Sequence, residues 1–162
     1  MDFRKSLFLL AIVGFIFLLP SCWNNSTGVK TGLVLVNVLD KELYDDCHIK
    51  GSINIPFDQL EDAANRIDKN AEVVCYCSNY MCGASSSARN KLIDMGYKKV
   101  YVYEAGTADW YQKGFPVGKN CRCQEGYLKG VIPAPDKKKE PYELTTQELK
   151  AKIDAFDTAT KK

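Results

Sequence analysis

The sequence predicts a single α/β domain with helices on both faces of a mainly parallel sheet. Three observations support this fold class. Apolar segments of strand length alternate with segments of helical periodicity from about residue 33 to residue 118. The first of them, residues 33–38, is an almost continuous apolar run, as in strands that are covered on both faces. Strands that alternate with helices favour parallel pairing, and 162 residues suit one core of ordinary size.

The elements are expected in the following order. Residues 33–38 form the first strand, residues 41–46 a short polar helix, and residues 52–55 a second strand that Pro56 ends. Residues 57–68 have the apolar spacing of a helix. The third strand covers residues 73–77, and the helix of residues 84–95 follows, with Gly96 at its C-terminal end. Residues 100–103 and 106–113 are the fourth strand and the next helix.

Cys77 lies at the carboxyl end of the third strand, which is where parallel α/β sheets bind their ligands. A loop of residues 78–83 separates it from the helix behind it. Such a turn directs backbone N–H groups inward, and the helix adds a partial positive charge at its N-terminus. Both effects favour the thiolate, which is the nucleophilic form of cysteine. The sequence therefore predicts that Cys77 is a nucleophile with a lowered pKa.

Several short motifs occur in a specific order and spacing. They are LVNV at residues 35–38, HIKGSINIP at 48–56, VCYC at 74–77, MGYKKV at 95–100 and GFPV at 114–117. Together they resemble the rhodanese (sulfurtransferase-like) domain over residues 33–118. The resemblance implies that Cys77 accepts a sulfane sulfur as a persulfide from a small sulfur-containing donor. It also implies transfer of that sulfur to cyanide or a thiol.

A persulfide is anionic near neutral pH and needs hydrogen-bond donors around it. We expect the loop amides to supply them without side-chain charge. Ser85 and Ser86 could add hydroxyl donors, or they could cap the helix. The substrate-binding residues expected from this argument are the two serines and the loop residues Ser78, Asn79, Tyr80, Met81 and Gly83.

The chain departs from the family pattern at positions that bear on specificity. Many active rhodaneses carry Arg in the loop to bind an anionic donor such as thiosulfate, but this loop has none and ends in Cys82. Arg89 is about a turn and a half into the helix, so we expect it to point elsewhere. Related phosphatases require Cys-x5-Arg, and because position 83 is Gly, a phosphatase is not expected.

Cys82 and the departures from the family pattern leave three functions open. Cys82 can be a resolving thiol that attacks a Cys77 persulfide or sulfenic acid, which would make the protein a thiol redox enzyme or sensor. It can also be a small buried side chain beside a sulfurtransferase nucleophile. The departures from the family pattern at Asn37, Leu39 and Ala105 also allow a non-catalytic rhodanese-like binding module.

The N-terminal sequence has the features of an export signal. Arg4 and Lys5 precede an apolar stretch of signal-peptide length, which ends in Leu19-Pro20-Ser21-Cys22. This sequence resembles the lipobox of bacterial lipoproteins, although Pro20 is unusual there, and an uncleaved anchor is the alternative. We expect residues 1–21 to be a signal peptide, Cys22 to be lipidated, and residues 22–32 to be a tether. The protein would then be a membrane-anchored lipoprotein of the bacterial cell envelope.

The other cysteines of the mature chain give weaker signals. Six thiols allow 15 disulfide connectivities, and the sequence does not choose among them. Cys75 is expected in the core, and Cys47 lies in a turn beside His48, for which a structural role is expected. Cys121 and Cys123 are too close together for an unstrained bridge, so each pairs elsewhere or stays free. Soft-metal binding is conceivable, but with no Cys-x2-Cys pair and one His, no metal site and no cofactor are predicted.

The C-terminal part differs from the domain in composition. Residues 119–141 form a Cys-containing extension and a linker rich in Pro and Lys, and residues 142–162 form an amphipathic helix and tail. Thr145 and Glu148 have capping-box spacing. We expect this helix to dock where family members place an N-terminal helix. The net charge of +2, without a concentrated basic face, gives no indication of a nucleic-acid partner.

Overall fold

The computed structural model describes residues 30–133 and 135–161. The predicted signal peptide, Cys22 and most of the tether lie outside the described residues. Within the described part of the chain, no helix has the length and apolar character needed to cross a bilayer.

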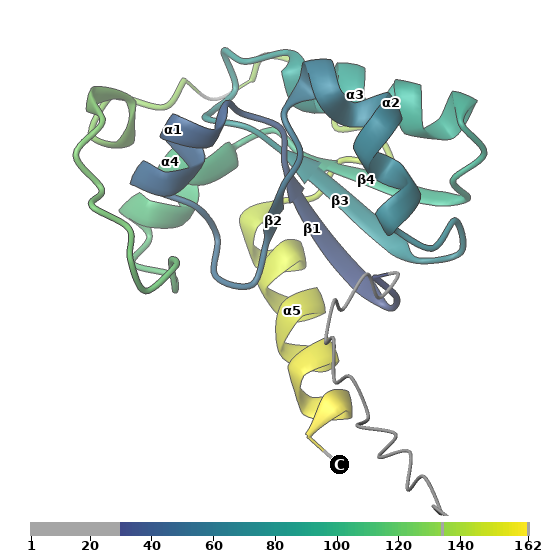
Figure 1. The fold of residues 1–162 in the computed structure, drawn as a ribbon. Helices are drawn as coiled ribbons and strands as arrows, with labels where there is room; N and C mark the ends of the chain where they lie inside the picture. The colour runs from purple at the N-terminus through teal and green to yellow at the C-terminus, as the bar shows by residue number, and fades with distance from the viewer. Residues whose placement is uncertain (1–29, 134, 162) are drawn as a thin grey trace, which may run out of the picture.

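The centre of the fold is a four-stranded parallel sheet in the order β2-β1-β3-β4 (Figure 1). The two middle strands are in register, with Val36 beside Cys75, and Cys75 in turn lies beside Val102 of the edge strand. The α/β fold class predicted from the sequence is therefore confirmed. The strands are β1 (Leu33–Asn37), β2 (Ile53–Asn54), β3 (Glu72–Tyr76) and β4 (Lys99–Tyr103).

The helices largely follow the predicted order, with one exception. The segment expected as a continuous helix over residues 57–68 is broken into a 3-10 turn, one α-helical turn and a second 3-10 turn. The elements are α1 (Lys41–Asp46), η1 (Phe57–Gln59), α2 (Leu60–Ala63), η2 (Ala64–Arg66), α3 (Ala84–Asp94), α4 (Gly106–Gln112), η3 (Gly126–Leu128) and α5 (Thr146–Thr160).

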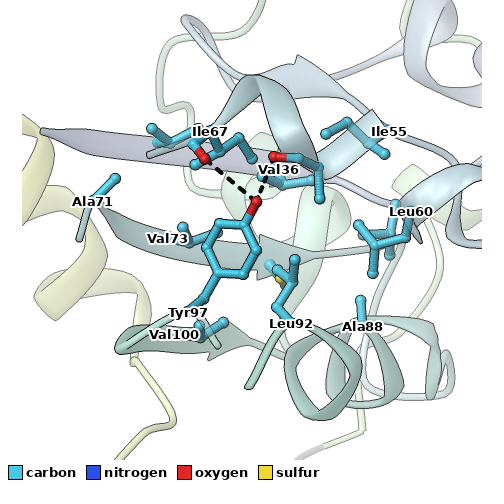
Figure 2. Packing of buried hydrophobic residues seen from close by; sticks show 14 of the residues in the cluster. Val36, Ile55, Leu60, Ile67, Ala71, Val73, Ala88, Leu92, Tyr97 and Val100 are labelled. Carbon is cyan, nitrogen blue, oxygen red and sulfur yellow. Dashed lines mark hydrogen bonds between the residues drawn. The ribbon is translucent and has the colours of Figure 1, made fainter. Parts of the chain in front are cut away.

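Tyr97 gives the physical reason for this break. Its hydroxyl donates to the backbone oxygens of Ala64 and Ile67, as Figure 2 shows. Ile67 has extended backbone dihedrals, and its N–H closes a tight turn onto Ala64. The tyrosine thus satisfies carbonyl groups that a continuing helix would have used.

Two apolar clusters cover opposite faces of the sheet. Alternate strand residues such as Val36 and Val73 pack with Leu60 of α2 and Leu92 of α3 on one face (Figure 2). The intervening strand residues form the other cluster with side chains of α4 and α5, namely Leu35, Val74, Tyr76, Tyr103, Trp110 and Leu149. This alternation shows that both faces of the sheet are buried.

The C-terminal helix α5 is part of the core. The predicted capping box is confirmed, since Thr145 and Glu148 bond each other's backbone N–H groups. Leu149 is fully buried against the sheet. Just before the helix, the chain pairs with β4, because Val102 N–H donates to Tyr142 (2.9 Å) and Leu144 N–H donates to Val102 (2.8 Å). The C-terminal segment therefore extends both the sheet and the core.

Candidate active site

Cys77 follows directly after the central strand β3 and is fully buried. Its Sγ lies 3.0 Å from the backbone oxygen of Cys82, 3.4 Å from Ser85 Oγ and 3.8 Å from the backbone oxygen of Asn79. The loop therefore curves around the sulfur atom, but it turns two carbonyl groups toward it where the sequence predicts N–H groups. The two carbonyl groups accept hydrogen bonds, so they favour the protonated thiol.

The N-terminus of α4 holds the backbone of Cys77 and Ser78 in place. Thr107 N–H donates to the oxygen of Cys77 (2.9 Å), and Ala108 N–H donates to the oxygen of Ser78 (2.9 Å). Gly106 allows this close approach, because its φ is +64° and an added Cβ would lie 2.6 Å from both backbone segments. The argument from sequence did not assign this supporting role, which depends on a contact between residues about 30 positions apart.

Cys77 Sγ donates to the backbone oxygen of Cys82 (3.0 Å), and the thiols of the two residues influence each other's proton affinity. This interaction lowers the pKa of Cys82 to about 5, and the N–H groups of Ala84 and Ser78 contribute in the same direction. The same interaction, together with burial, raises the pKa of Cys77. Of the two thiols, Cys82 therefore gives up its proton more readily.

The structure therefore differs from the sequence prediction of a lowered pKa at Cys77. The helix N-terminus does favour a thiolate, but Cys82 is nearer to the first amides of α3 and is only half-buried. A buried sulfur atom that faces carbonyl groups keeps its proton more strongly. Transfer of this proton to Cys82 would place the thiolate on Cys77.

Ser85 and Ser86 differ in position. Ser85 is fully buried beside Cys77, and its N–H and hydroxyl both favour the Cys77 thiolate. Ser86 instead donates to Glu104 Oε1 (2.7 Å), so its hydroxyl is directed away from the sulfur. Neither serine caps α3, whose N-cap is Gly83 without a side-chain bond. Successive side chains on an α-helix point in directions about 100° apart, so Ser85 faces Cys77 and Ser86 does not.

The loop amides are only partly available to a ligand at Cys77. Met81 N–H donates to Asn79 Oδ1 (2.9 Å), and Cys82 N–H donates to the backbone oxygen of Asn79 (3.0 Å). Asn79 thus closes the loop as a turn, and these two amides are used within it. The side chain of Met81 is 79% exposed, and Tyr80 is half-buried. The predicted cradle of amides is therefore narrower than expected, with Ser85 as its donor at Cys77.

Beside the loop, the charged side chains are already paired. Tyr80, Glu104 and Lys137 line a hollow of about 130 Å³. Lys137 Nζ bonds Glu104 (2.8 Å) and Glu143 (2.7 Å), which raise its pKa. Arg89 lies 3.7 Å above the ring of Tyr142 and donates to the backbone oxygen of Val100, away from Cys77 as expected. Lys139 also lines the hollow and is paired with Glu148 (2.6 Å), so both lysines of the hollow are neutralised by carboxylates.

The fold and this site define a class of α/β proteins with a buried cysteine at the carboxyl end of a central parallel strand. A family model described as the rhodanese-like domain matches residues 24–113, more than half of the chain. The chain belongs to the rhodanese-like family. The resemblance found in the motifs is confirmed.

Known proteins support this assignment. Thiosulfate sulfurtransferase GlpE of Coxiella burnetii is 28% identical over 81 residues, which cover 50% of this chain and 74% of that protein. Adenylyltransferase and sulfurtransferase UBA4 of Meyerozyma guilliermondii is 31% identical over 90 residues, which cover 49% of this chain and 20% of that protein. The crystal structure of the BH2092 protein from Bacillus halodurans matches with a TM-score of 0.51 and 28% identity, over 65% of this chain and 73% of that one.

Proposed function

We propose that this protein transfers sulfane sulfur through a persulfide on Cys77. In the first step, the Cys77 thiolate attacks the outer sulfur of a donor R–S–SH or thiosulfate. The S–S bond of the donor breaks, and R–S⁻ or sulfite leaves with the electron pair. In the second step, a thiolate or cyanide attacks the terminal sulfur, which regenerates the Cys77 thiolate.

The observation that carries this proposal is the buried Cys77 thiol at the end of β3, enclosed by the loop that carries Cys82 and by Ser85. Cys82 can take the Cys77 proton before attack, because its own pKa is lowered. Ser85 N–H and Oγ can then stabilise the charge on the Cys77 sulfur. The sulfurtransferase relatives support the same reaction class.

The surroundings of the loop favour a low-molecular-weight persulfide donor over thiosulfate. Thiosulfate carries two negative charges, and within the described chain Lys137 is held by two carboxylates while Arg89 is directed elsewhere. A singly charged persulfide has less need of a cation. We therefore propose a thiol persulfide as donor and a thiol as acceptor.

We also propose that the protein acts at the bacterial cell envelope, anchored through lipid on Cys22. The motif Leu19-Pro20-Ser21-Cys22 supports this location. Incorporation of labelled fatty acid into the wild-type chain and its loss in Cys22→Ser would agree with the proposal. Equal labelling of both chains would refute it.

Turnover measurements test the proposed reaction. With a sulfane donor and cyanide or a thiol as acceptor, the wild type is expected to turn over. Cys77→Ser should abolish transfer, while Cys82→Ser should retain part of it. Cys121→Ser is the matched control, because it changes a half-buried thiol outside the loop. Equal transfer by wild type and Cys77→Ser would refute the proposal.

The proximity of Cys82 to Cys77 also supports a second function, that of a thiol redox enzyme or sensor. Attack of the Cys82 thiolate on a Cys77 persulfide forms a Cys77–Cys82 disulfide, and the outer sulfur leaves as hydrosulfide. Attack on a Cys77 sulfenic acid, formed with a peroxide, gives the same disulfide and releases hydroxide. If both Cys77→Ser and Cys82→Ser abolish activity and sulfane donors are not used, this second function replaces sulfur transfer.

A further inference from the structure

Three cysteines from two distant segments of the chain converge outside the loop of Cys77. The Sγ atoms of Cys47, Cys121 and Cys123 all lie within 4.8 Å of one another. The Sγ atoms of Cys47 and Cys123 are 3.2 Å apart. The sequence prediction of no metal site rested on the spacing of each motif alone, and the fold combines two motifs into one cluster.

Backbone contacts hold the cluster together, in addition to the hydrogen bond between the Cys123 and Cys47 thiols. Cys47 ends α1, and Cys123 N–H donates to the backbone oxygen of Asp46 (2.9 Å). The buried carboxylate of Asp46 accepts from the N–H groups of Gln124 (3.1 Å) and Glu125 (3.0 Å). Asp46 thus holds the segment that carries Cys121 and Cys123 against the end of α1.

One neighbouring backbone group donates a hydrogen bond to the cluster. The backbone N–H of His48 donates to Cys121 Sγ at 3.3 Å. The His48 ring stacks on Tyr44, and its Nδ1 lies 2.7 Å from the Tyr44 backbone oxygen, so this nitrogen donates there and is not free as a ligand. Donors to sulfur stabilise thiolates, as they do around metal–thiolate sites.

We propose that Cys47, Cys121 and Cys123 form a three-thiolate site for a soft, thiophilic cation of the Cu(I) or Cd(II) type. Thiolate ligands select such cations, and binding releases the thiol protons. Cys121 and Cys123 are half-buried, so an ion can reach the site, while Cys47 closes its inner side. This inference is independent of the reaction proposed at Cys77.

The convergence of three sulfur atoms favours an ion over a single disulfide. A disulfide joins two sulfur atoms at about 2.05 Å and would leave the third without a role. The Cys47–Cys123 separation of 3.2 Å is longer than a bond, and Cys121 lies beside both atoms. A tetrahedral zinc site needs a fourth ligand in addition to the three thiolates. The nearby Asp46 oxygens do not supply it, because they already accept backbone hydrogen bonds.

Titration of the reduced full chain with Cd(II) under anaerobic conditions tests the site. The reference is Cys77→Ser/Cys82→Ser, which removes the other thiol pair. We expect the reference to bind Cd(II) with a thiolate-to-metal charge-transfer band in the ultraviolet. Each of Cys47→Ser, Cys121→Ser and Cys123→Ser in this background should lower the affinity at least tenfold.

Folding controls keep the test decisive. Cys47 is fully buried, so its variant could unfold, but Cys121 and Cys123 are half-buried and circular dichroism should show that their variants stay folded. Unchanged Cd(II) affinity in folded Cys121→Ser and Cys123→Ser would overturn the proposal. A Cys47–Cys123 disulfide that forms equally with and without Cd(II) would also overturn it.

Discussion

Substitution of Gly106 by alanine should loosen the backbone that holds Cys77. At φ +64° a non-glycine residue costs about 1–2 kcal/mol. The new Cβ would also lie 2.6 Å from the backbone oxygen of Cys77 and from Ser78, and such overpacking costs about 1–3 kcal/mol. We therefore expect Gly106→Ala to lower the free energy of unfolding by about 2–5 kcal/mol.

Two other glycines separate these effects. Gly51 has φ +85° with open space around its Cα, so Gly51→Ala should show the backbone cost alone, about 1–2 kcal/mol. Gly83 has φ −75° and open space, so Gly83→Ala should change stability little. Denaturant unfolding measures all three, and sulfur transfer should fall furthest in Gly106→Ala. If Gly106→Ala is no more destabilising than Gly51→Ala, the packing argument fails.

Three further predictions concern the core and the thiol pair. Leu149→Ala should destabilise the protein by about 2–5 kcal/mol, because Leu149 is fully buried. The control Gln147→Ala changes an exposed residue of the same helix and should alter stability by less than about 0.5 kcal/mol. Equal effects of the two substitutions in thermal unfolding would show that α5 does not contribute to the core. The alkylation rate of Cys82 should fall as the pH drops through about 5, the pKa of its thiol. In Cys77→Ala, which removes the neighbouring thiol, the midpoint should rise toward the ordinary value of about 8.5. An unchanged midpoint would contradict the influence of Cys77 on Cys82. Tyr80→Arg should raise kcat/KM for thiosulfate roughly tenfold or more, because a charge-assisted hydrogen bond contributes about 1.5–3 kcal/mol. The kcat/KM for a persulfide donor should rise less. Equal increases for the two donors would refute the proposed donor preference.

The fold was predictable from local pattern, because most elements carry their own periodicity. The apolar run of residues 33–38 predicts a buried strand, and the spacing of Thr145 and Glu148 predicts the start of a helix. Neither prediction requires a distant contact. The break in the segment of residues 57–68 was not predictable, since it depends on Tyr97, about 30 positions away, whose hydroxyl takes two of its carbonyl groups. Tertiary contact overrides local propensity there.

The site was predictable in its position and less so in its details. Cys77 and Cys82 are joined by a short loop, so their proximity follows from the sequence. Which of the two holds the negative charge depends on burial and on the direction of carbonyl groups, which the sequence does not state. The contact between Cys47 and Cys123 joins residues 76 positions apart, so only the folded chain brings them together.

Peptide mass spectrometry after brief exposure to a sulfane donor tests the central claim most directly. Excess donor is removed, and the peptide that contains Cys77 is compared between wild type, Cys77→Ser and Cys82→Ser. We predict a gain of one sulfur atom on Cys77 in the wild type, a more persistent gain in Cys82→Ser, and none in Cys77→Ser. A folded wild-type protein that gains no sulfur on Cys77 would contradict the persulfide mechanism and would indicate a non-catalytic rhodanese-like module.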